Sequence, residues 1–311
     1  MPVLKGHKQP VQWVAFAADG ASLLSVDRSD GVRVWDAPSG RPRWADDEHC
    51  YASVALTADG RQVFTYDRDG TAPTDINGHP RLAFDREHPA QLRDIRTGVP
   101  AAVPVVADWL ADLAFCPDGG RCVARLGTDS RDLHWWAYPS WEPLPVWADV
   151  VPHALARFKA VAFSPDGRTL AGMNSAGVTV FDVPAGGRRR VHPFPVVQDE
   201  CRLAFHPDGR HLAVGSGTRL AVLDVETGAE VGAIRQARKF FLGAAFTPDG
   251  RFLATASNEA TVKFWDATTW RLVTEFAWQA GGLRCLAFSP DGLTAAAGGT
   301  GNTVVLWDVD L

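Results

Sequence analysis

The sequence predicts an all-β fold in which seven four-stranded antiparallel units form one closed ring. Three observations predict it: a phrase ending in Asp-Gly that recurs seven times, apolar strands around each copy, and chain ends that complete one another. The 311 residues suit two ordinary domains or one large all-β ring, so length does not decide. With 46% hydrophobic and 22% charged residues, a sizeable packed core is expected.

The repeated phrase is an Ala, an apolar residue, two variable residues and Asp-Gly. Its Asp residues follow one another at intervals of 40, 59, 48, 42, 41 and 42 residues, so the second and third units carry insertions. Five copies read Pro-Asp-Gly, in which Pro favours the first corner of a type I turn and Gly accepts the left-handed conformation. Each copy therefore predicts a hairpin turn, for example between strands at residues 160–163 and 169–172.

A third strand stands about ten residues after each hairpin in most units and ends in an aromatic or apolar residue followed by Asp, as in residues 32–36 and 304–308. A short fourth strand follows in every unit except the last, as in residues 230–234 and 272–276. Four antiparallel strands per unit of about 42 residues form one blade of a β-propeller.

The two ends of the sequence supply an independent test of this count. The seventh unit stops at Leu311, soon after its third strand, whereas residues 2–5 read as a fourth strand without a unit of its own. We expect residues 2–5 to complete the seventh blade. Residues 1–311 then form a single seven-bladed propeller, which closes by pairing its ends and leaves no long unpaired edge.

At this point the chain resembles the WD-repeat β-propeller family, whose units carry a Gly-His, a Pro-Asp-Gly turn and a Trp-Asp that ends the third strand. The Gly-His occurs once, at Gly6-His7, and full Trp-Asp pairs stand at residues 35–36, 265–266 and 307–308. The equivalent positions of the other units hold Arg-Asp, Trp-Ala, Phe-Asp and Leu-Asp. The resemblance covers essentially the whole chain.

The resemblance implies that His7 is a buried structural residue, linked to an Asp in the turn before the third strand, a Ser or Thr, and the Trp. Here that turn position holds Ser29, Glu259 or Gly301, so most blades are expected to rely on apolar packing. Trp35, Trp136, Trp265 and Trp307 occupy the position that packs between blades. This leaves Trp109, Trp141, Trp147, Trp270 and Trp278 as surface candidates.

In this fold the loops that lead into the first strands and those that join second to third strands lie on one face, here called the first-strand face. The Asp-Gly turns lie on the opposite, Asp-Gly face, where their carboxylates are expected to form turns. Seven residues precede the first strands near the central channel: Pro10, Cys50, Trp109, Arg157, Asp199, Phe240 and Gly282.

The resemblance implies a non-catalytic platform that binds a protein or peptide on the first-strand face. Aromatic and Arg side chains are the usual hot spots of such interfaces. We expect Trp109, Phe240 and Trp278 as apolar anchors and Arg157, Lys239 and Asp199 as charged contacts. Arg238 and Arg86 complete the set of candidate residues.

An insertion at residues 67–89 also emerges on the first-strand face and is the longest irregular segment. Long loops in compact folds are often functional, and this one contains Arg86 with His79, Phe84 and His88. The alternative is an insertion without a function. Its start resembles a calcium loop, but a Gly falls one position early and no Glu closes it at the twelfth position.

The remaining features restrict the partner and the compartment. The net charge of −5 gives no field that attracts nucleic acid. No signal peptide or apolar stretch long enough to span a membrane stands in the sequence, and five cysteines without metal-ligand spacing suit a reducing compartment. We expect a cytoplasmic monomer with no cofactor and no metal, and the Arg, Ala and Gly content indicates a bacterial source.

Known catalytic motifs for nucleophiles, phosphate loops and zinc are absent from the sequence. A propeller can also assemble an active site at its channel from residues of several blades, which one sequence does not reveal. An enzyme or small-ligand-binding protein with its site at the channel mouth is therefore the alternative function. Cys122, Cys201 and Cys285 lie in predicted strands and are expected to pack in the core.

Overall fold

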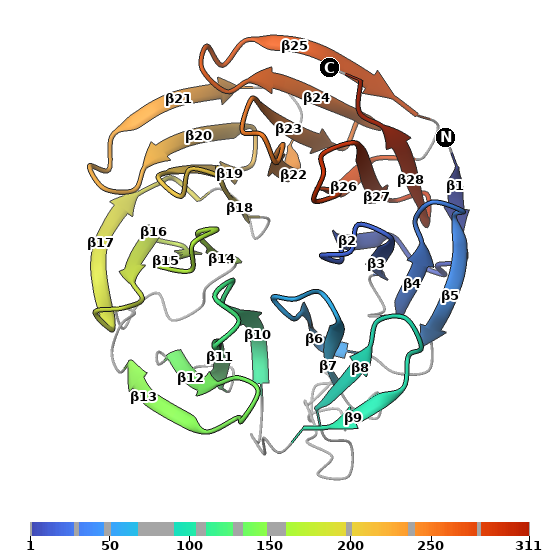
Figure 1. Cartoon of the computed structure of the whole chain (residues 1–311). Helices are drawn as coiled ribbons and strands as arrows, with labels where there is room; N and C mark the ends of the chain where they lie inside the picture. Colours follow the sequence, from blue (N-terminus) through green and yellow to red (C-terminus); the bar gives the residue numbers. More distant parts are fainter. Residues whose placement is uncertain are drawn as a thin grey trace, which may run out of the picture.

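Seven four-stranded antiparallel sheets stand around a central opening (Figure 1). The computed structural model describes residues 2–27, 31–46, 51–67, 90–103, 110–126, 133–147, 160–196, 201–235, 240–278 and 281–310. Among these residues no helix is long and apolar enough to cross a membrane. The predicted all-β class, the seven blades and the propeller arrangement are confirmed.

The first three blades begin at the innermost strand and run outward in chain order. Blade 1 contains β2 (Val11–Phe16), β3 (Ser22–Asp27), β4 (Val32–Asp36) and β5 (Arg41–Asp46). Blade 2 contains β6 (Tyr51–Leu56), β7 (Gln62–Asp67), β8 (Gln91–Asp94) and β9 (Pro100–Ala102). Blade 3 contains β10 (Leu110–Phe115), β11 (Arg121–Leu126), β12 (Leu133–Ala137) and β13 (Pro143–Trp147).

The next three blades repeat the same order. Blade 4 contains β14 (Ala160–Phe163), β15 (Thr169–Asn174), β16 (Gly177–Asp182) and β17 (Gly187–Pro193). Blade 5 contains β18 (Cys201–Phe205), β19 (His211–Ser216), β20 (Arg219–Asp224) and β21 (Glu230–Arg235). Blade 6 contains β22 (Phe241–Phe246), β23 (Phe252–Ser257), β24 (Thr261–Asp266) and β25 (Leu272–Ala277).

Blade 7 is built from both ends of the chain, as the sequence predicts. It contains β26 (Leu283–Phe288), β27 (Thr294–Gly299) and β28 (Thr303–Asp308), and β1 (Val3–Lys5) pairs antiparallel with β28 as its outermost strand. The partners are Val3 with Val305, Leu4 with Val304 and Lys5 with Thr303. The N–H of Leu306 also donates to the carbonyl oxygen of Pro2 at 3.1 Å.

The core lies between neighbouring blades rather than within one. Strand side chains alternate between the two faces of a sheet, so each blade packs one face on the blade before it and the other on the blade after it. One cluster joins β1 and blade 7 to blade 1 through Leu4, Leu306, Val11, Leu23 and Trp35. Each blade therefore needs both neighbours to bury its apolar side chains.

The thiols of three cysteines belong to this core, as predicted for Cys122 and Cys285; Cys116 is the third. Burial raises the pKa of Cys116 to about 11 and that of Cys122 and Cys285 to about 12. These groups are therefore protonated and unreactive at neutral pH. The side chain of Cys201 lies outside the described residues.

We expect Leu4→Ala to destabilise the protein by about 2–5 kcal/mol, because Leu4 is 3% exposed in the cluster that joins blades 7 and 1. Val3→Ala is the matched control, since the side chain of Val3 is 49% exposed. This substitution should change the free energy of unfolding by less than about 0.5 kcal/mol. Deletion of residues 1–5 should lower the Tm further. Equal denaturation midpoints for all three variants and the wild type would contradict closure through β1.

Candidate functional site

Two of the eight predicted contact residues lie within the described part of the chain. Phe240 is half-buried and immediately precedes β22, whose first residue, Phe241, is fully buried between blades. Trp278 directly follows β25. The other six lie outside the described residues: Arg86, Trp109, Arg157, Asp199, Arg238 and Lys239. Residues 68–89 of the insertion also lie outside them.

Trp278 packs between two blades and is also partly exposed to solvent. Its ring lies 4.5 Å from that of Trp307 and 6.0 Å from that of Phe276, measured between centroids, and it packs on the cluster between blades 6 and 7. Its backbone N–H donates to the carbonyl oxygen of Ala260 at 3.1 Å. The half-buried ring is thus fixed in place before any partner binds.

Trp141 is not a surface residue, contrary to the expectation from the sequence. It is 7% exposed, and its ring packs on Phe64 of blade 2 and Phe115 of blade 3. Trp141 and Trp270 occupy a turn position of positive φ, +60° and +57°, that other blades fill with glycine. At this position each Trp side chain contacts the preceding blade: Trp141 packs on Phe64 of blade 2, and Trp270 donates to the Val231 carbonyl of blade 5. For Trp141 this contact buries the ring.

A hydrogen-bonded network lies beneath the first-strand face of blade 1. His7, in the loop between β1 and β2, contacts the Asp27 carboxylate through Nδ1 at 3.0 Å and Ser25 Oγ through Nε2 at 2.6 Å. The indole Nε1–H of Trp35 donates to the same Oγ at 2.8 Å. With a proton on His7 Nδ1, Ser25 donates to Nε2 and accepts from Trp35, so every group is satisfied.

Asp27, His7 and Ser25 stand in the order of a nucleophilic triad, but their surroundings make them structural. Ser25 is fully buried, and the Trp35 indole already occupies its Oγ. A substrate carbonyl does not reach this oxygen. The buried, structural role predicted for His7 is therefore confirmed by the geometry.

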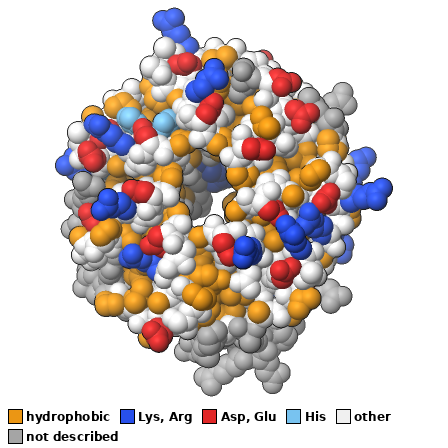
Figure 2. Space-filling model, viewed as in Figure 1, with side chains coloured by type: hydrophobic (Ala, Val, Ile, Leu, Met, Phe, Trp, Pro, Cys, Tyr) orange, Lys and Arg blue, Asp and Glu red, His pale blue; other side chains and the backbone are white. Residues whose placement is uncertain are grey.

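The opposite face carries the Asp-Gly turns, and Figure 2 shows acidic and basic side chains scattered together over this face. Asp59 Oδ1 accepts the N–H of Arg61 at 3.0 Å, and equivalent bonds form in the other turns. In blade 4 the hydroxyl of Ser164 donates to Asp166 and holds the pKa of that carboxyl below its ordinary value. These carboxylates form the turns, as expected.

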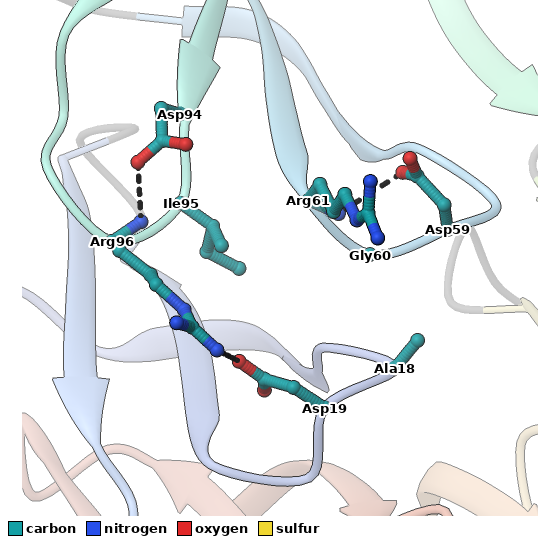
Figure 3. Close-up of a pocket in the computed structure, with 8 residues that line it drawn as sticks. All are labelled: Ala18, Asp19, Asp59, Gly60, Arg61, Asp94, Ile95 and Arg96. Carbon is teal, nitrogen blue, oxygen red and sulfur yellow. Dashed lines mark hydrogen bonds and ion pairs between the residues drawn. The ribbon is translucent and has the colours of Figure 1, made fainter.

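A hollow of about 540 Å³ lies on this face between blades 1 and 2 (Figure 3). Arg96 crosses it and donates to the Asp19 carboxylate of blade 1 at 3.2 Å. The N–H of Thr97 donates to Asp94, and this bond holds the pKa of the Asp94 carboxyl below its ordinary value. Asp19 is thus paired with Arg96, while Asp59 and Asp94 accept the backbone N–H groups of Arg61 and Thr97.

The comparison with known proteins agrees with this architecture. A family model described as "WD40: WD domain, G-beta repeat" matches residues 1–36, 237–266 and 270–308, about a third of the chain in blades 1, 6 and 7. The remaining blades have the same four-stranded order and close the ring with them. The chain is a seven-bladed β-propeller, and its matched repeats are consistent with the WD-repeat family. WD40 propellers generally mediate protein–protein interaction and are generally non-catalytic.

A curated relative is "Pre-mRNA-processing factor 19" from Oryza sativa subsp. japonica, which is 39% identical over 72 residues. The match covers 22% of this chain and 13% of the relative. Since the match spans about an eighth of that protein's length, it supports the repeat assignment rather than a shared role.

The blades of this propeller differ in whether the indole N–H of the third-strand Trp has a hydrogen-bond acceptor. In blade 6, Trp265 Nε1–H donates to Thr255 Oγ1 at 2.9 Å. In blade 7 the equivalent position is Ala297, and the buried Trp307 Nε1 has no hydrogen-bond partner among the described residues. Asp27, the carboxylate of the blade 1 network, was not predicted from the sequence, because it ends β3 and does not stand at the turn position that Ser29 occupies.

We expect Ser25→Ala to lower the free energy of unfolding by about 2 kcal/mol, since it leaves buried polar atoms of His7 and Trp35 unsatisfied. Ala297→Ser should raise it by about 1 kcal/mol by giving Trp307 an acceptor. Denaturant unfolding measures both free-energy changes. The two variants control for each other, because one removes and the other adds a hydroxyl beside an indole, with opposite expected signs. Stabilisation by Ser25→Ala, or destabilisation by Ala297→Ser, would show that the hydroxyl does not act through the indole.

Proposed function

We propose that this chain is a non-catalytic platform that binds a protein or peptide on its first-strand face. The observation that carries the proposal is the WD40 propeller itself, whose members generally mediate protein–protein interaction. Closure through β1 and burial between blades make the ring a rigid support. Loops on such a support present side chains without a large loss of conformational entropy on binding.

The anchor side chains of the proposed interface are aromatic. Phe240 keeps part of its ring exposed beside the fully buried Phe241, and Trp278 is held against Trp307. We propose that Trp109 adds a third anchor, and that Arg157, Asp199, Arg238, Lys239 and Arg86 supply charge complementarity around the anchors. Fixed aromatic rings are effective anchors because binding costs them little rotational freedom.

We further propose that the partner is a protein rather than nucleic acid and that the protein works as a cytoplasmic monomer. The net charge of −5 supports the first point, because nucleic acid is attracted to positive surfaces. The buried free thiols of Cys116, Cys122 and Cys285 support the second, since a reducing compartment keeps thiols free.

Affinity capture from a lysate of the source cell tests the binding face. The baits are the wild type, a Trp109→Ala, Lys239→Ala, Phe240→Ala triple variant, and an Arg61→Ala, Arg251→Ala control on the Asp-Gly face. Loss of two anchors at about 2 kcal/mol each weakens binding far more than tenfold. We expect a partner that the wild type and the control retain and that the triple variant loses.

Equal Tm values for the three baits establish that the triple variant is folded. Retention of the same partner by the triple variant and its loss from the Asp-Gly face control would overturn the proposed face. Absence of any protein that binds the wild type above a bead blank would overturn the platform itself and favour a small ligand at the channel mouth.

A further inference from the structure

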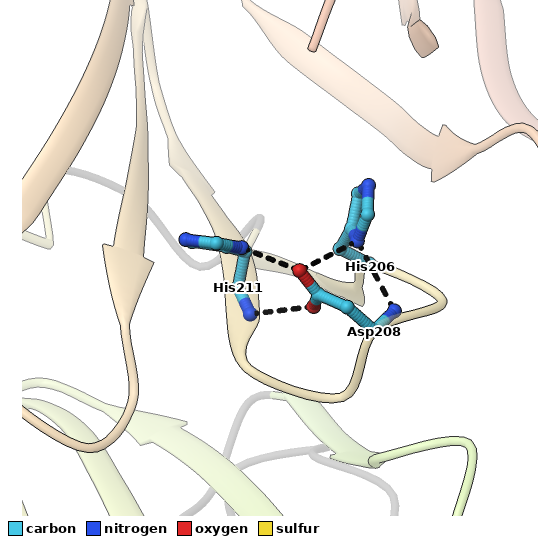
Figure 4. A group of neighbouring side chains, drawn as sticks. All are labelled: His206, Asp208 and His211. Carbon is cyan, nitrogen blue, oxygen red and sulfur yellow. Dashed lines mark hydrogen bonds and ion pairs between the residues drawn. The ribbon is translucent and has the colours of Figure 1, made fainter. Parts of the chain in front are cut away.

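Blade 5 carries two histidines at its Asp-Gly turn. His206 follows β18 and His211 begins β19, with Asp208 in the turn between them (Figure 4). Asp208 Oδ1 accepts the backbone N–H groups of Arg210 and His211 at 2.8 and 3.0 Å, as expected for this turn. Its Oδ2 remains for the two rings: His206 Nδ1 lies 3.0 Å away and His211 Nδ1 2.6 Å away.

The other blades show that the turn does not require these rings. The position of His206 holds Ser or Thr in four of them, and there the hydroxyl donates to the turn carboxylate: Thr57, Ser164, Thr247 and Ser289. The position of His211 holds Thr in blades 4 and 7, as Thr169 and Thr294. Blade 5 is the one Asp-Gly turn in the sequence that has histidine at either position.

The ring of His206 is held in one orientation by the neighbouring blade. Its Nε2 lies 2.9 Å from the carbonyl oxygen of Gly250, and the backbone N–H of Asp208 donates to Nδ1 at 3.1 Å. These contacts place the proton on Nε2 and a lone pair on Nδ1. A backbone carbonyl that accepts from the distal ring nitrogen is the usual support of a metal-binding histidine.

The close contact between the His206 ring and blade 6 also requires a glycine at position 250. A Cβ on this residue, whose φ is +73°, would lie 2.7 Å from Nε2 of His206. The ring further packs edge-on against Phe246, with the centroids 4.9 Å apart. His206 is therefore positioned before any ligand arrives.

The three side chains together offer a set of metal ligands. One donor atom from each lies within 4.8 Å of the others. Donors bonded to one transition-metal ion at about 2.0–2.2 Å lie roughly 3–3.5 Å apart, so small side-chain rotations suffice. Nδ1 of His206 and the Asp208 carboxylate already lie 3.0 Å apart, close to the spacing of two ligands of one ion.

The surroundings favour a cation. A hollow of about 340 Å³ between blades 4 and 5 is lined by Asp208 together with Asp166, Asp182 and Glu226. Of the two arginines that line it, Arg210 is paired with Asp224, its Nε 2.6 Å from the carboxylate. Carboxylates thus outnumber the cationic groups among the residues that line this hollow, which borders the cluster at Asp208.

We propose that His206, Asp208 and His211 bind a divalent transition-metal ion of the Zn²⁺ class on the Asp-Gly face of blade 5. Two imidazoles and one carboxylate suit Zn²⁺, Co²⁺ or Ni²⁺, whereas Mg²⁺ and Ca²⁺ prefer oxygen ligands alone. Three protein ligands leave a coordination position open for water or for a donor from another molecule. The site is separate from the proposed platform, because it lies on the opposite face.

Isothermal titration of the untagged full chain with Zn²⁺ tests the site. The variants His206→Ser and His211→Thr introduce residues that other blades carry at these positions, so the turn is expected to fold. His134→Gln is the matched control, since this partly buried histidine of β12 lies outside the cluster. Asp208 is left unchanged because the turn depends on it.

We expect the wild type and His134→Gln to bind one Zn²⁺ per chain and to gain Tm in its presence. Each cluster variant should bind at least about 100-fold more weakly while keeping the Tm measured without metal. Co²⁺ should bind the same site and give a visible absorption band that the variants lack. Mg²⁺ should produce no heat.

Two results would overturn the proposal. One is absence of Zn²⁺ binding to the folded wild type, which would leave the cluster as a carboxylate that hydrogen-bonds protonated histidine. The other is Zn²⁺ binding of the same affinity and stoichiometry in the wild type and in the double variant His206→Ser, His211→Thr, which would place the ion elsewhere on the chain.

Discussion

The pairing of β1 with β28 is the interaction on which the rest of the structure depends. A blade has two apolar faces, and only a closed ring gives each face a neighbour. Leu4 and Leu306 join the cluster that contains Val11 and Trp35 of blade 1, so the seam between the chain ends is packed like the other blade boundaries. Without that seam, two sheet faces and an edge would be exposed to water.

Closure also explains why function belongs to loops and turns. Every strand is committed to the ring, so the side chains free to differ between blades are those at the two rims. On one rim, Phe240 and Trp278 are anchored by their buried neighbours Phe241 and Trp307. On the other rim, blade 5 replaces the usual hydroxyl with His206, and Gly250 of blade 6 leaves room for its ring.

The fold was predictable from the sequence, because each copy of Asp-Gly implies the same local hairpin and the copies recur at a nearly regular spacing. The extra strand at the N-terminus and the missing strand at the C-terminus indicated how the ring closes. Details that depend on contacts between residues distant in the sequence were not predictable. Trp141 is buried by rings of two blades although it stands in a turn, and Asp27 reaches His7 from the end of a neighbouring strand. The His206 cluster had a visible signal, two histidines flanking one Asp-Gly turn, but its support from Gly250 appears only in the structure.

Hydrogen exchange at the seam tests the central claim most directly. The N–H of Leu306 bonds to Pro2, whereas β15 (Thr169–Asn174) lies inside blade 4, far from the chain ends in the ring. If closure holds the ring together, the amide of Leu306 exchanges only with global unfolding, at the same free energy as the amides of β15. Rapid exchange at Leu306 while β15 stays protected would show that the seam opens alone and would contradict the account.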